Sequence, residues 1–513
     1  MVTDLPRIVV AAPASGHGKT TVATGLMAAL RRTGLEVSGH KVGPDYIDPG
    51  YHALATGRPG RNLDPHLVGE ERIVPLLLHG AGAGGAGIGA GRPADVAVIE
   101  GVMGLYDGHI GGDGFASTAH VAALTGTPVV LVVDISHASR SIAAVVLGMA
   151  SYDPAVRIAG VVLNKAGSVR HSDEVRRALA PLGIPVLGVL QRDDDVTAPS
   201  RHLGLVPAAE RPDAARSLDH LAGKVAASID LEAVMRIARE APPLAGEAWS
   251  ARAALGGVDA GHGSACRDAP GDGRVHGVDD DEVRPLIAVA GGRAFTFRYA
   301  ETVELLEAAG CSVVPFDPLA DEALPGTAAG IYLGGGFPEV HAADLAANAP
   351  MLRALRAATA AGVPTVAECA GLLYLCCTLD GVPMVGAVDA DAAMAPRLTL
   401  AYRRSTAVAD SVLAAAGTEV TGHEFHRTAV NPPAGAGGAA GSHAGAPSTS
   451  GPGAAPAWTS SAGPEGFVHG SVHASYLHTH WAGHPALAAR FAAQARQFAR
   501  VADRGMGTAA ELV

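Results

Sequence analysis

The first segment whose residue types could do chemistry is a glycine-containing loop near the N-terminus. Residues 13–21 read PASGHGKTT and match the phosphate-loop pattern GxxxxGK[ST] at every fixed position but the first, which is Pro13. Backbone amides of such a loop surround an anion, and the following helix adds partial positive charge. Lys19 would reach the terminal phosphates of a nucleotide, and Thr20 would hold magnesium. The predicted ATP-binding residues are Ser15, Gly16, His17, Gly18, Lys19, Thr20 and Thr21.

Two polar segments follow later apolar runs. Residues 41–52 read KVGPDYIDPGYH, in which Asp45 and Asp48 could orient a metal or substrate and Lys41 could contact phosphate or carboxylate. An Asp-Pro turn with local side-chain caps fits these residues equally. Glu100 ends another apolar run, where a nucleotide-bound magnesium needs a carboxylate ligand. A solvated strand-end glutamate is the alternative interpretation.

A third strand end carries Asn164 and Lys165, which could contact the edge and face of a purine. We assign them to the ATP site, although a dipeptide alone is a weak signal.

A possible nucleophile lies in the second half of the chain. Residues 363–373 read VPTVAECAGLL, which predicts a strand, a tight turn that exposes Cys369, and a helix. The helix N-terminus is expected to lower the pKa of the thiol. A buried, inert cysteine is the alternative.

Partners for this thiol are found on either side in the sequence. Gly334 and Gly335 follow an apolar run and could aim backbone amides at an oxyanion. His478 and His480 are two residues apart on an extended segment and would point the same way, which makes them candidate bases. A metal pair or two surface histidines would also fit. Residues 422–426, GHEFH, could contact substrate through His423 or Glu424, or be structural.

The elements that must position these residues indicate an α/β fold. Apolar runs rich in Val, Ile and Leu alternate with helical segments, which is typical of parallel strands buried on both faces of a doubly wound sheet. Ligands of such sheets gather at the carboxyl ends of the strands. The predicted strands of the first half are 7–12, 37–42, 96–100, 128–134, 158–164 and 185–190.

Composition shifts suggest two domains. We expect an ATP domain at 1–240, a linker at 241–284, a second α/β domain at 285–500 and a tail at 501–513. Residues 432–464 are rich in Ala, Gly, Ser and Pro, and we expect a disordered insertion there.

Charge and cysteine usage narrow the class of protein. A formal net charge of −12 argues against a general nucleic-acid or membrane-surface binder. The five cysteines form no metal-type or disulfide spacing, and no apolar run is long enough to span a bilayer. We expect a cytoplasmic protein without nucleic-acid or membrane partners, and we leave a homodimer open.

Taken together, these motifs resemble the cobyrinate (or hydrogenobyrinate) a,c-diamide synthases of cobalamin biosynthesis. The matching stretches are 12–21, 41–52, 100–108 and 160–165. The first domain resembles dethiobiotin synthetase, which activates a carboxylate with ATP. The resemblance implies magnesium at Thr20, Glu100 and Asp45, and carboxylate binding or activation by Lys41, Asp45, Tyr46, Asp48 and Asp107.

The second domain resembles the flavodoxin-like class I glutamine amidotransferases. The resemblance makes Cys369 the nucleophile and aligns His478 with the base, and it places Gly334, Gly335 and Ala370 at the oxyanion or glutamine. Many relatives have Glu where this chain has His480, so a dyad is an alternative to a triad.

The resemblance implies a glutamine-hydrolysing, ATP-dependent ligase with Mg²⁺ as cofactor. Its substrates would be L-glutamine, ATP and a corrinoid acid whose a and c acetate groups are amidated through an acyl phosphate. Two alternatives are a nickel-sirohydrochlorin a,c-diamide synthase and a non-ligase P-loop ATPase with a vestigial glutaminase domain.

Overall fold

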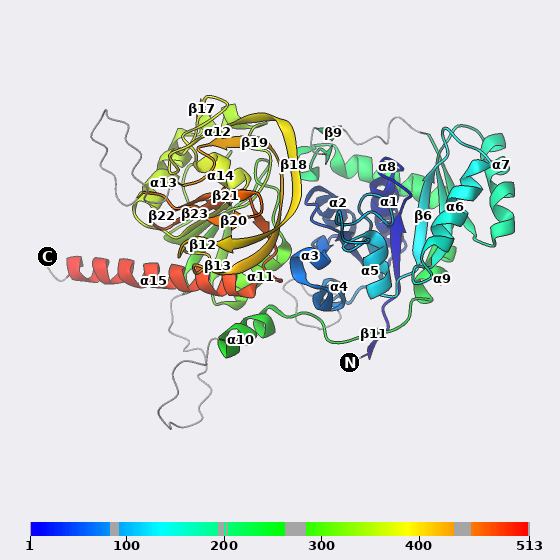
Figure 1. The fold of residues 1–513 in the computed structure, drawn as a ribbon, viewed down its shortest axis with the longest axis horizontal. Coiled ribbons are helices and arrows are strands. Elements are labelled where there is room, and N and C mark those ends of the chain that lie inside the picture. The colour runs from blue at the N-terminus through cyan, green and yellow to red at the C-terminus, as the bar shows by residue number, and fades with distance from the viewer. Residues whose placement is uncertain are drawn as a thin grey trace, which may run out of the picture. The chain divides into compact units, whose positions relative to one another are not determined.

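The computed structural model of the protein describes residues 2–82, 92–192, 200–201, 204–261, 284–435 and 453–510. The chain divides into two compact units, Met1–Ser250 and Ala251–Val513. Each unit has a parallel sheet with helices around it (Figure 1). Within the described ranges, the helices are all too short or too polar to cross a membrane.

The first unit is built on a seven-stranded sheet in the order β4-β3-β5-β2-β6-β7-β8, and all neighbouring strands are parallel. All six predicted strands are present, and β4 at the edge is additional. The elements are β1 Val2–Thr3, β2 Arg7–Ala11, α1 Lys19–Arg32, β3 Val37–Val42, α2 Ile47–Thr56, β4 Arg61–Leu63, α3 Pro65–Val68, η1 Glu70–Arg72, α4 Ile73–Gly80, β5 Val96–Glu100, α5 Thr118–Leu124, β6 Val129–Asp134, α6 Ser141–Tyr152, β7 Ile158–Ala166, α7 Val169–Leu179, η2 Ala180–Leu182, β8 Val186–Gln191, β9 Ser200–Arg201, β10 Gly204–Leu205, η4 Ala208–Glu210, α8 Ala214–Ser228, α9 Leu231–Arg239 and β11 Leu244–Ala245.

The core of the first unit explains why its strands could be predicted. Every residue of β2, β3 and β5 is buried, as parallel strands covered on both faces require. The small side chains of α1 let this helix pack closely on the sheet, and α8 lies against α1. The phosphate loop, the 41–52 segment and Glu100 therefore meet at the carboxyl edge of β2, β3 and β5.

The second unit contains a six-stranded sheet in the order β13-β12-β14-β15-β23-β22, of which only the β22 edge is antiparallel. Its five parallel strands follow the 2-1-3-4-5 order of flavodoxin-like folds. The elements are α10 Ala251–Gly261, β12 Leu286–Ala290, α11 Ala300–Ala308, β13 Ser312–Phe316, β14 Ala328–Leu333, α12 Ala342–Ala347, α13 Ala349–Ala360, β15 Thr365–Glu368, α14 Ala370–Leu375, β16 Thr378–Leu379, β17 Val382–Pro383, β18 Asp391–Ala407, β19 Glu419–Asn431, β20 Trp458–Ser460, β21 Gly463–Glu465, β22 Phe467–His469, β23 Val472–Ser475, β24 His478–Thr479 and α15 Pro485–Ala510.

A second sheet of this unit was not predicted. Its longest strands are the antiparallel pair β18 and β19. Strand β24 pairs with β19, and His423 lies opposite His478. This sheet therefore connects the GHEFH segment directly to the segment that carries the candidate base.

Elements also occupy segments that were expected to lack structure. Helix α10 falls within the expected linker 241–284, and α15 continues to Ala510 within the expected tail 501–513. Residues 262–283 and 511–513 lie outside the described residues. The domain boundaries themselves stay a prediction.

The expectation of a disordered insertion at 432–464 is wrong for its last part. Residues 458–465 form β20 and β21, and β20 pairs with β18 so that Trp458 lies opposite Ala407. Trp458 is buried and packs edge-on against His473. The composition rich in Ala, Gly, Ser and Pro predicted disorder, but it did not reveal that Trp458 is a buried apolar residue that fixes this segment. Residues 436–452 lie outside the described residues.

Replacing Trp458 with alanine is expected to destabilise the second unit by about 3–5 kcal/mol, because a buried aromatic side chain leaves a cavity when it is removed. Urea unfolding measures the change. Thr459→Ala, at the exposed neighbouring position of β20, is the matched control and should change stability by less than about 0.5 kcal/mol. Equal stability of the two variants would contradict a structural role for β20.

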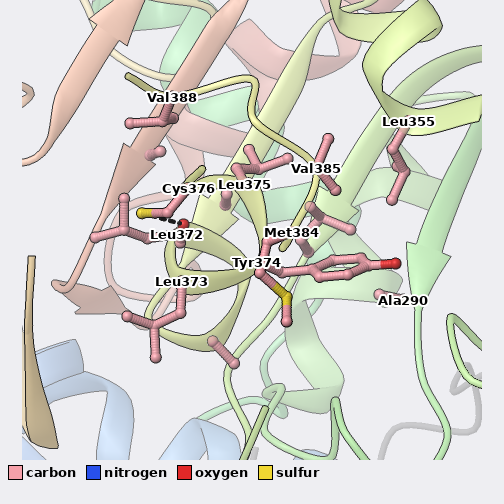
Figure 2. Close-up of a cluster of buried hydrophobic side chains, with 14 of the residues drawn as sticks. Ala290, Leu355, Leu372, Leu373, Tyr374, Leu375, Cys376, Met384, Val385 and Val388 are labelled. Atoms are coloured by element: carbon pink, nitrogen blue, oxygen red, sulfur yellow. Dashed lines mark hydrogen bonds between the residues drawn. The ribbon is translucent and has the colours of Figure 1, made fainter. Parts of the chain in front are cut away.

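The helix after Cys369 is anchored in an apolar core. Leu372, Leu373, Tyr374 and Leu375 of α14 are buried among side chains of α13, β12 and the loop after β17 (Figure 2). Cys376 belongs to this cluster and its thiol donates to the carbonyl of Leu372 at 3.3 Å. The core thus fixes the position of the turn that carries Cys369.

Candidate active site

The phosphate loop of the first unit joins β2 to α1 and depends on glycine at Gly18. Its φ is +90°, and a Cβ there would lie 2.3 Å from the side-chain nitrogen of Asn164. Gly16 also has a positive φ, of +85°. Any other residue at Gly18 would be strained in its backbone and would also displace Asn164.

Asn164 and Lys165 hold this loop from the end of β7. The Asn164 amide donates to the carbonyl of His17 at 2.9 Å, and the Lys165 ammonium donates to the carbonyl of Gly16 at 2.8 Å. Lys165 also forms an ion pair of 2.7 Å with Asp134. In turn, the imidazole of His17 accepts from the amide of Asp134 at 2.9 Å. The structure thus brings the predicted ATP residues together, with Asn164 and Lys165 as loop supports.

Lys19 is buried at the start of α1 with its ammonium turned back over the loop. It donates to the carbonyl oxygens of Met103 and Ala14. Burial, together with the positive charge of Lys41, lowers the pKa of Lys19 to about 8. An anion in the loop would relieve both effects, because it supplies the negative charge that this ammonium lacks.

Glu100 stands at the centre of a buried charge network at the ends of β3 and β5. Its Oε1 accepts from the hydroxyl of Thr20 at 2.5 Å and from the ammonium of Lys41 at 3.0 Å. Its Oε2 lies 2.7 Å from Nε2 of His52. The Lys41 ammonium also pairs with Asp48 at 2.6 Å. Strands β3 and β5 place Lys41 and Glu100 directly opposite each other.

The charges of this network are unevenly balanced. Burial alone would raise the pKa of Glu100, but the charge of Lys41 and the hydrogen bond from His52 lower it by more and hold it below the usual range. Burial and the carboxylates of Asp45 and Glu100 raise the pKa of Asp48. The ammonium of Lys41 lowers it, but Lys41 also pairs with Glu100 and so does not offset all of the negative charge. The site therefore favours an additional cation near Asp48.

The remaining predicted residues of the first unit are Asp45, Tyr46 and Asp107, whose role in substrate binding stays a prediction. One oxygen of Asp45 accepts from the amides of Ile47 and Asp48 at 2.7 and 3.0 Å, so this side chain caps α2. Tyr46 is the half-buried residue before α2. Asp107 accepts from the amide of Gly104 at 2.9 Å and stabilises its own loop.

A cavity of about 570 Å³ opens beside the phosphate loop. The predicted residues Lys19, Thr20, Lys41, Asp45 and Asp48 line it. Residues that sequence reasoning missed complete its wall: Thr24, Tyr51, Gln191, Arg211, Ser217 and Lys224. Tyr51 lies within the 41–52 segment, whereas Arg211 and the residues of α8 belong to no motif and reach the cavity only through the fold.

In the second unit, Cys369 occupies the sharp turn between β15 and α14. Its φ of +49° is rare for a residue with a side chain and is typical of a strained turn at a functional site. The thiol is buried, and burial raises its pKa; Glu339, Glu368 and Glu424 raise it further. The amide of Ala370 at the start of α14 does lower the pKa, as expected, but burial outweighs it, so the expectation of a net lowering is wrong.

His478 lies close to this turn through two sets of contacts. A Cβ on Gly335 would touch the His478 ring at 2.5 Å, and the carbonyl of the preceding Gly334 accepts from the amide of Gly371 at 3.1 Å. In addition, the carboxylate of Glu368 accepts from the hydroxyl of Thr479 at 3.0 Å. Glu368, which precedes Cys369, is thus hydrogen-bonded to Thr479, which follows His478.

His480 has different surroundings from His478. The His478 ring stacks on His423 with centroids 5.0 Å apart, whereas the His480 ring stacks on Tyr299 at 4.0 Å and lies 3.7 Å from the carboxylate of Glu301. The expectation that the two imidazoles point the same way stays a prediction, since these contacts show only that the two rings have different neighbours.

The candidate oxyanion donors differ in availability. The amide of Gly335 donates to the carbonyl of Phe297 at 3.0 Å and so is already engaged. The amide of Ala370 bonds to Cys369 and favours its thiolate. Glu424, which was a candidate substrate contact and not an oxyanion donor, forms an ion pair of 2.9 Å with Arg403. Ala370 is therefore the donor best placed to act at the nucleophile.

Known proteins match the chain over both units. Residues 8–206 match the family model of the CobQ/CobB/MinD/ParA nucleotide-binding domain, and residues 286–486 match that of the CobB/CobQ-like glutamine amidotransferase domain. The hydrogenobyrinate a,c-diamide synthase of Thermobifida fusca is 57% identical over 95% of this chain and 96% of its own. The protein of the same name from Streptomyces coelicolor is 53% identical over 96% of this chain and 98% of its own. The cobyrinate a,c-diamide synthase of Dehalococcoides mccartyi strain CBDB1 is 37% identical over 97% of this chain and 100% of its own.

Proposed function

The chain belongs to the family of hydrogenobyrinate and cobyrinate a,c-diamide synthases, and from this we propose that it converts the a and c acetate carboxylates of a corrinoid acid to amides. It does so with ATP and glutamine. The observation that supports this best is the presence in one chain of a phosphate loop with a buried charge network and of a nucleophile turn linked by hydrogen bonds to the segment of a histidine.

The first unit activates the carboxylate. ATP lies with its phosphates in the loop at residues 15–21, and Lys19 neutralises the charge that builds up on the transferred phosphoryl group. A substrate carboxylate oxygen attacks the γ-phosphorus, the bond to the β-phosphate oxygen breaks, and an acyl phosphate and ADP result. Ammonia then attacks the acyl carbon, phosphate leaves, and one proton is released.

The donor set beside the loop fits magnesium. The Thr20 hydroxyl and the carboxylates of Asp48 and Glu100 are hard oxygen ligands, and Asp48 and Glu100 share the single ammonium of Lys41, which supports a further cation beside them. In the described ranges no group of three or more His, Cys, Asp or Glu forms a metal cage, which suits an ion held largely by phosphates and water. Bound there, magnesium would offset phosphate charge. Asp45, which caps α2, is the weaker ligand candidate.

The second unit supplies the ammonia. Cys369 attacks the side-chain amide carbon of glutamine, His478 takes the thiol proton and passes it to the departing nitrogen, and a thioester forms with release of ammonia. Water then hydrolyses the thioester to glutamate and regenerates the thiol. The Ala370 amide stabilises the oxyanion of each tetrahedral intermediate.

Sequence identity favours the metal-free corrinoid as substrate. Relatives named hydrogenobyrinate a,c-diamide synthase are 46–57% identical to this chain, and those named cobyrinate a,c-diamide synthase are 36–38% identical. The alternatives, a nickel-sirohydrochlorin synthase and a P-loop ATPase without ligase activity, are not favoured by these matches.

Mass spectrometry tests the assignment directly. The protein is incubated with ATP, magnesium, glutamine and either hydrogenobyrinic or cobyrinic acid. We expect two successive acid-to-amide mass changes, faster with hydrogenobyrinic acid, and none when ATP is omitted. ATP hydrolysis without any amide product would contradict the proposal.

Two further expectations, on cellular location and on oligomeric state, stay proposals. A cytoplasmic location is supported by four cysteines that are free thiols among the described residues. A homodimer stays a prediction, which size-exclusion chromatography with light scattering would test.

A further inference from the structure

The residue before the nucleophile is a buried carboxylic acid that connects three strands. Glu368 ends β15 and is 3% exposed. Its Oε2 accepts from the hydroxyl of Tyr332 in β14 at 2.7 Å, and its Oε1 accepts from the hydroxyl of Thr479 in β24 at 3.0 Å. The indole of Trp481 donates to the same Thr479 hydroxyl at 3.1 Å and so fixes it.

These bonds join the parts of the glutaminase that must stay in register. β14 leads into the glycine run, β15 leads into Cys369, and β24 begins at His478. Building on the proposed function, we propose that Glu368 is a positioning residue of the glutaminase. Its carboxyl group holds the strand of the base against that of the nucleophile, and its charge controls thiolate formation at Cys369.

The charge effect follows from which groups face the thiol. The charged side chains that act on Cys369 are Glu339, Glu368 and Glu424, and all three disfavour a thiolate. Glu339 has the largest effect of the three, but Glu368 is the one that is adjacent to Cys369 in sequence and buried among the strands of the site.

Glu368 changes charge in the neutral range. Burial raises its pKa to about 7, against the hydrogen bonds from Tyr332 and Thr479. The titratable group that faces Glu368 from β14 is Tyr332. Burial and the nearby Glu368 raise the pKa of Tyr332 well above normal, whereas the charge of Arg298 lowers it. Below pH 7 Glu368 is neutral and the thiolate is opposed less; above pH 7 its negative charge opposes the thiolate more. The rise of glutaminase activity with pH should therefore be less steep above about pH 7 than below it.

Alkylation of Cys369 by iodoacetamide, read by peptide mass spectrometry, tests the charge effect without any substrate. Glu368→Gln keeps the shape and one of the two accepting oxygens but not the charge, so the alkylation rate at pH 8 should rise about threefold or more. Equal rates in the variant and the wild type would overturn the proposed control of charge.

The matched control is Glu465→Gln. Glu465 is another buried acid, whose pKa burial raises to about 7, and it accepts from Ser475 at 2.6 Å and from the amide of Tyr476 at 3.1 Å. It is not among the groups that shift the pKa of Cys369. Its substitution should leave the alkylation rate within about twofold of wild type, and an equal rise in both variants would overturn the specific role of Glu368.

Glutaminase kinetics test the positioning role. Glu368→Gln should lose the change of slope near pH 7, whereas Glu368→Ala should lower kcat about tenfold or more with little change in KM, because the strands lose their shared partner. Thr479→Val and Tyr332→Phe, which each remove one of the hydrogen bonds to Glu368, keep the test possible if Glu368→Ala does not fold. Wild-type kcat in both would overturn the proposal. A wild-type protein without glutaminase activity would instead contradict the proposed function.

Discussion

Replacing Cys369 with serine should abolish glutamine hydrolysis while leaving amidation driven by ammonium chloride intact. The loss should reach about 10⁴-fold or more in kcat, since a hydroxyl is a far weaker nucleophile than a thiol at this site. The change alters one atom at a turn whose φ of +49° the backbone already maintains, so the fold should persist. Ammonia measured from glutamine, and amide product measured with either nitrogen source, separate the two steps.

The matched control for this substitution is Cys376→Ser. Cys376 lies in the core beneath α14, and a serine hydroxyl can keep its bond to the carbonyl of Leu372. Glutaminase activity should stay within a few-fold of wild type. If Cys369→Ser still hydrolysed glutamine, or if it lost ammonia-driven amidation while folded, Cys369 would not be a nucleophile confined to nitrogen supply.

The strands that sequence reasoning found and missed differ in the range of the forces that form them. β2, β5 and β6 are short runs of Val, Ile and Ala between turns, and continuous burial leaves that signature in the sequence. β18 has no such signature, because most of its 17 residues are exposed or half-buried. It is a strand because it pairs with β19 and β20, and this pairing with separate segments cannot be read from the residues of β18 alone.

The same distinction separates the predicted from the unpredicted parts of the site. The phosphate loop is local, so the spacing of Gly18, Lys19 and Thr20 was enough to find it. The network around Glu100 depends on strand register, which sets Lys41 opposite Glu100 and cannot be read from either segment alone. The raised pKa of the Cys369 thiol depends on burial by the whole unit, and a helix-terminus argument misses it.

Replacing Lys19 with methionine should lower ATP-dependent amidation by about 10²–10³-fold or more and leave glutamine hydrolysis unchanged. Methionine fills much of the volume of the side chain, so the main loss is the ammonium that meets the phosphates. That ammonium is held over the loop by the carbonyl oxygens of Ala14 and Met103, and burial with the charge of Lys41 lowers its pKa to about 8. Nucleotide binding should therefore raise the pKa of Lys19, and proton uptake on ATP binding near pH 8 should be measurable in the wild type and reduced in the variant.

Arg32→Met supplies the control on the same helix. Arg32 is an exposed residue of the last turn of α1 that pairs with Asp219, and its replacement should change neither activity. Loss of both activities in a folded Lys19→Met protein would contradict separate sites for nitrogen release and carboxylate activation. Unchanged amidation would remove Lys19 from phosphate binding, because the loop amides alone would then suffice to hold and activate ATP.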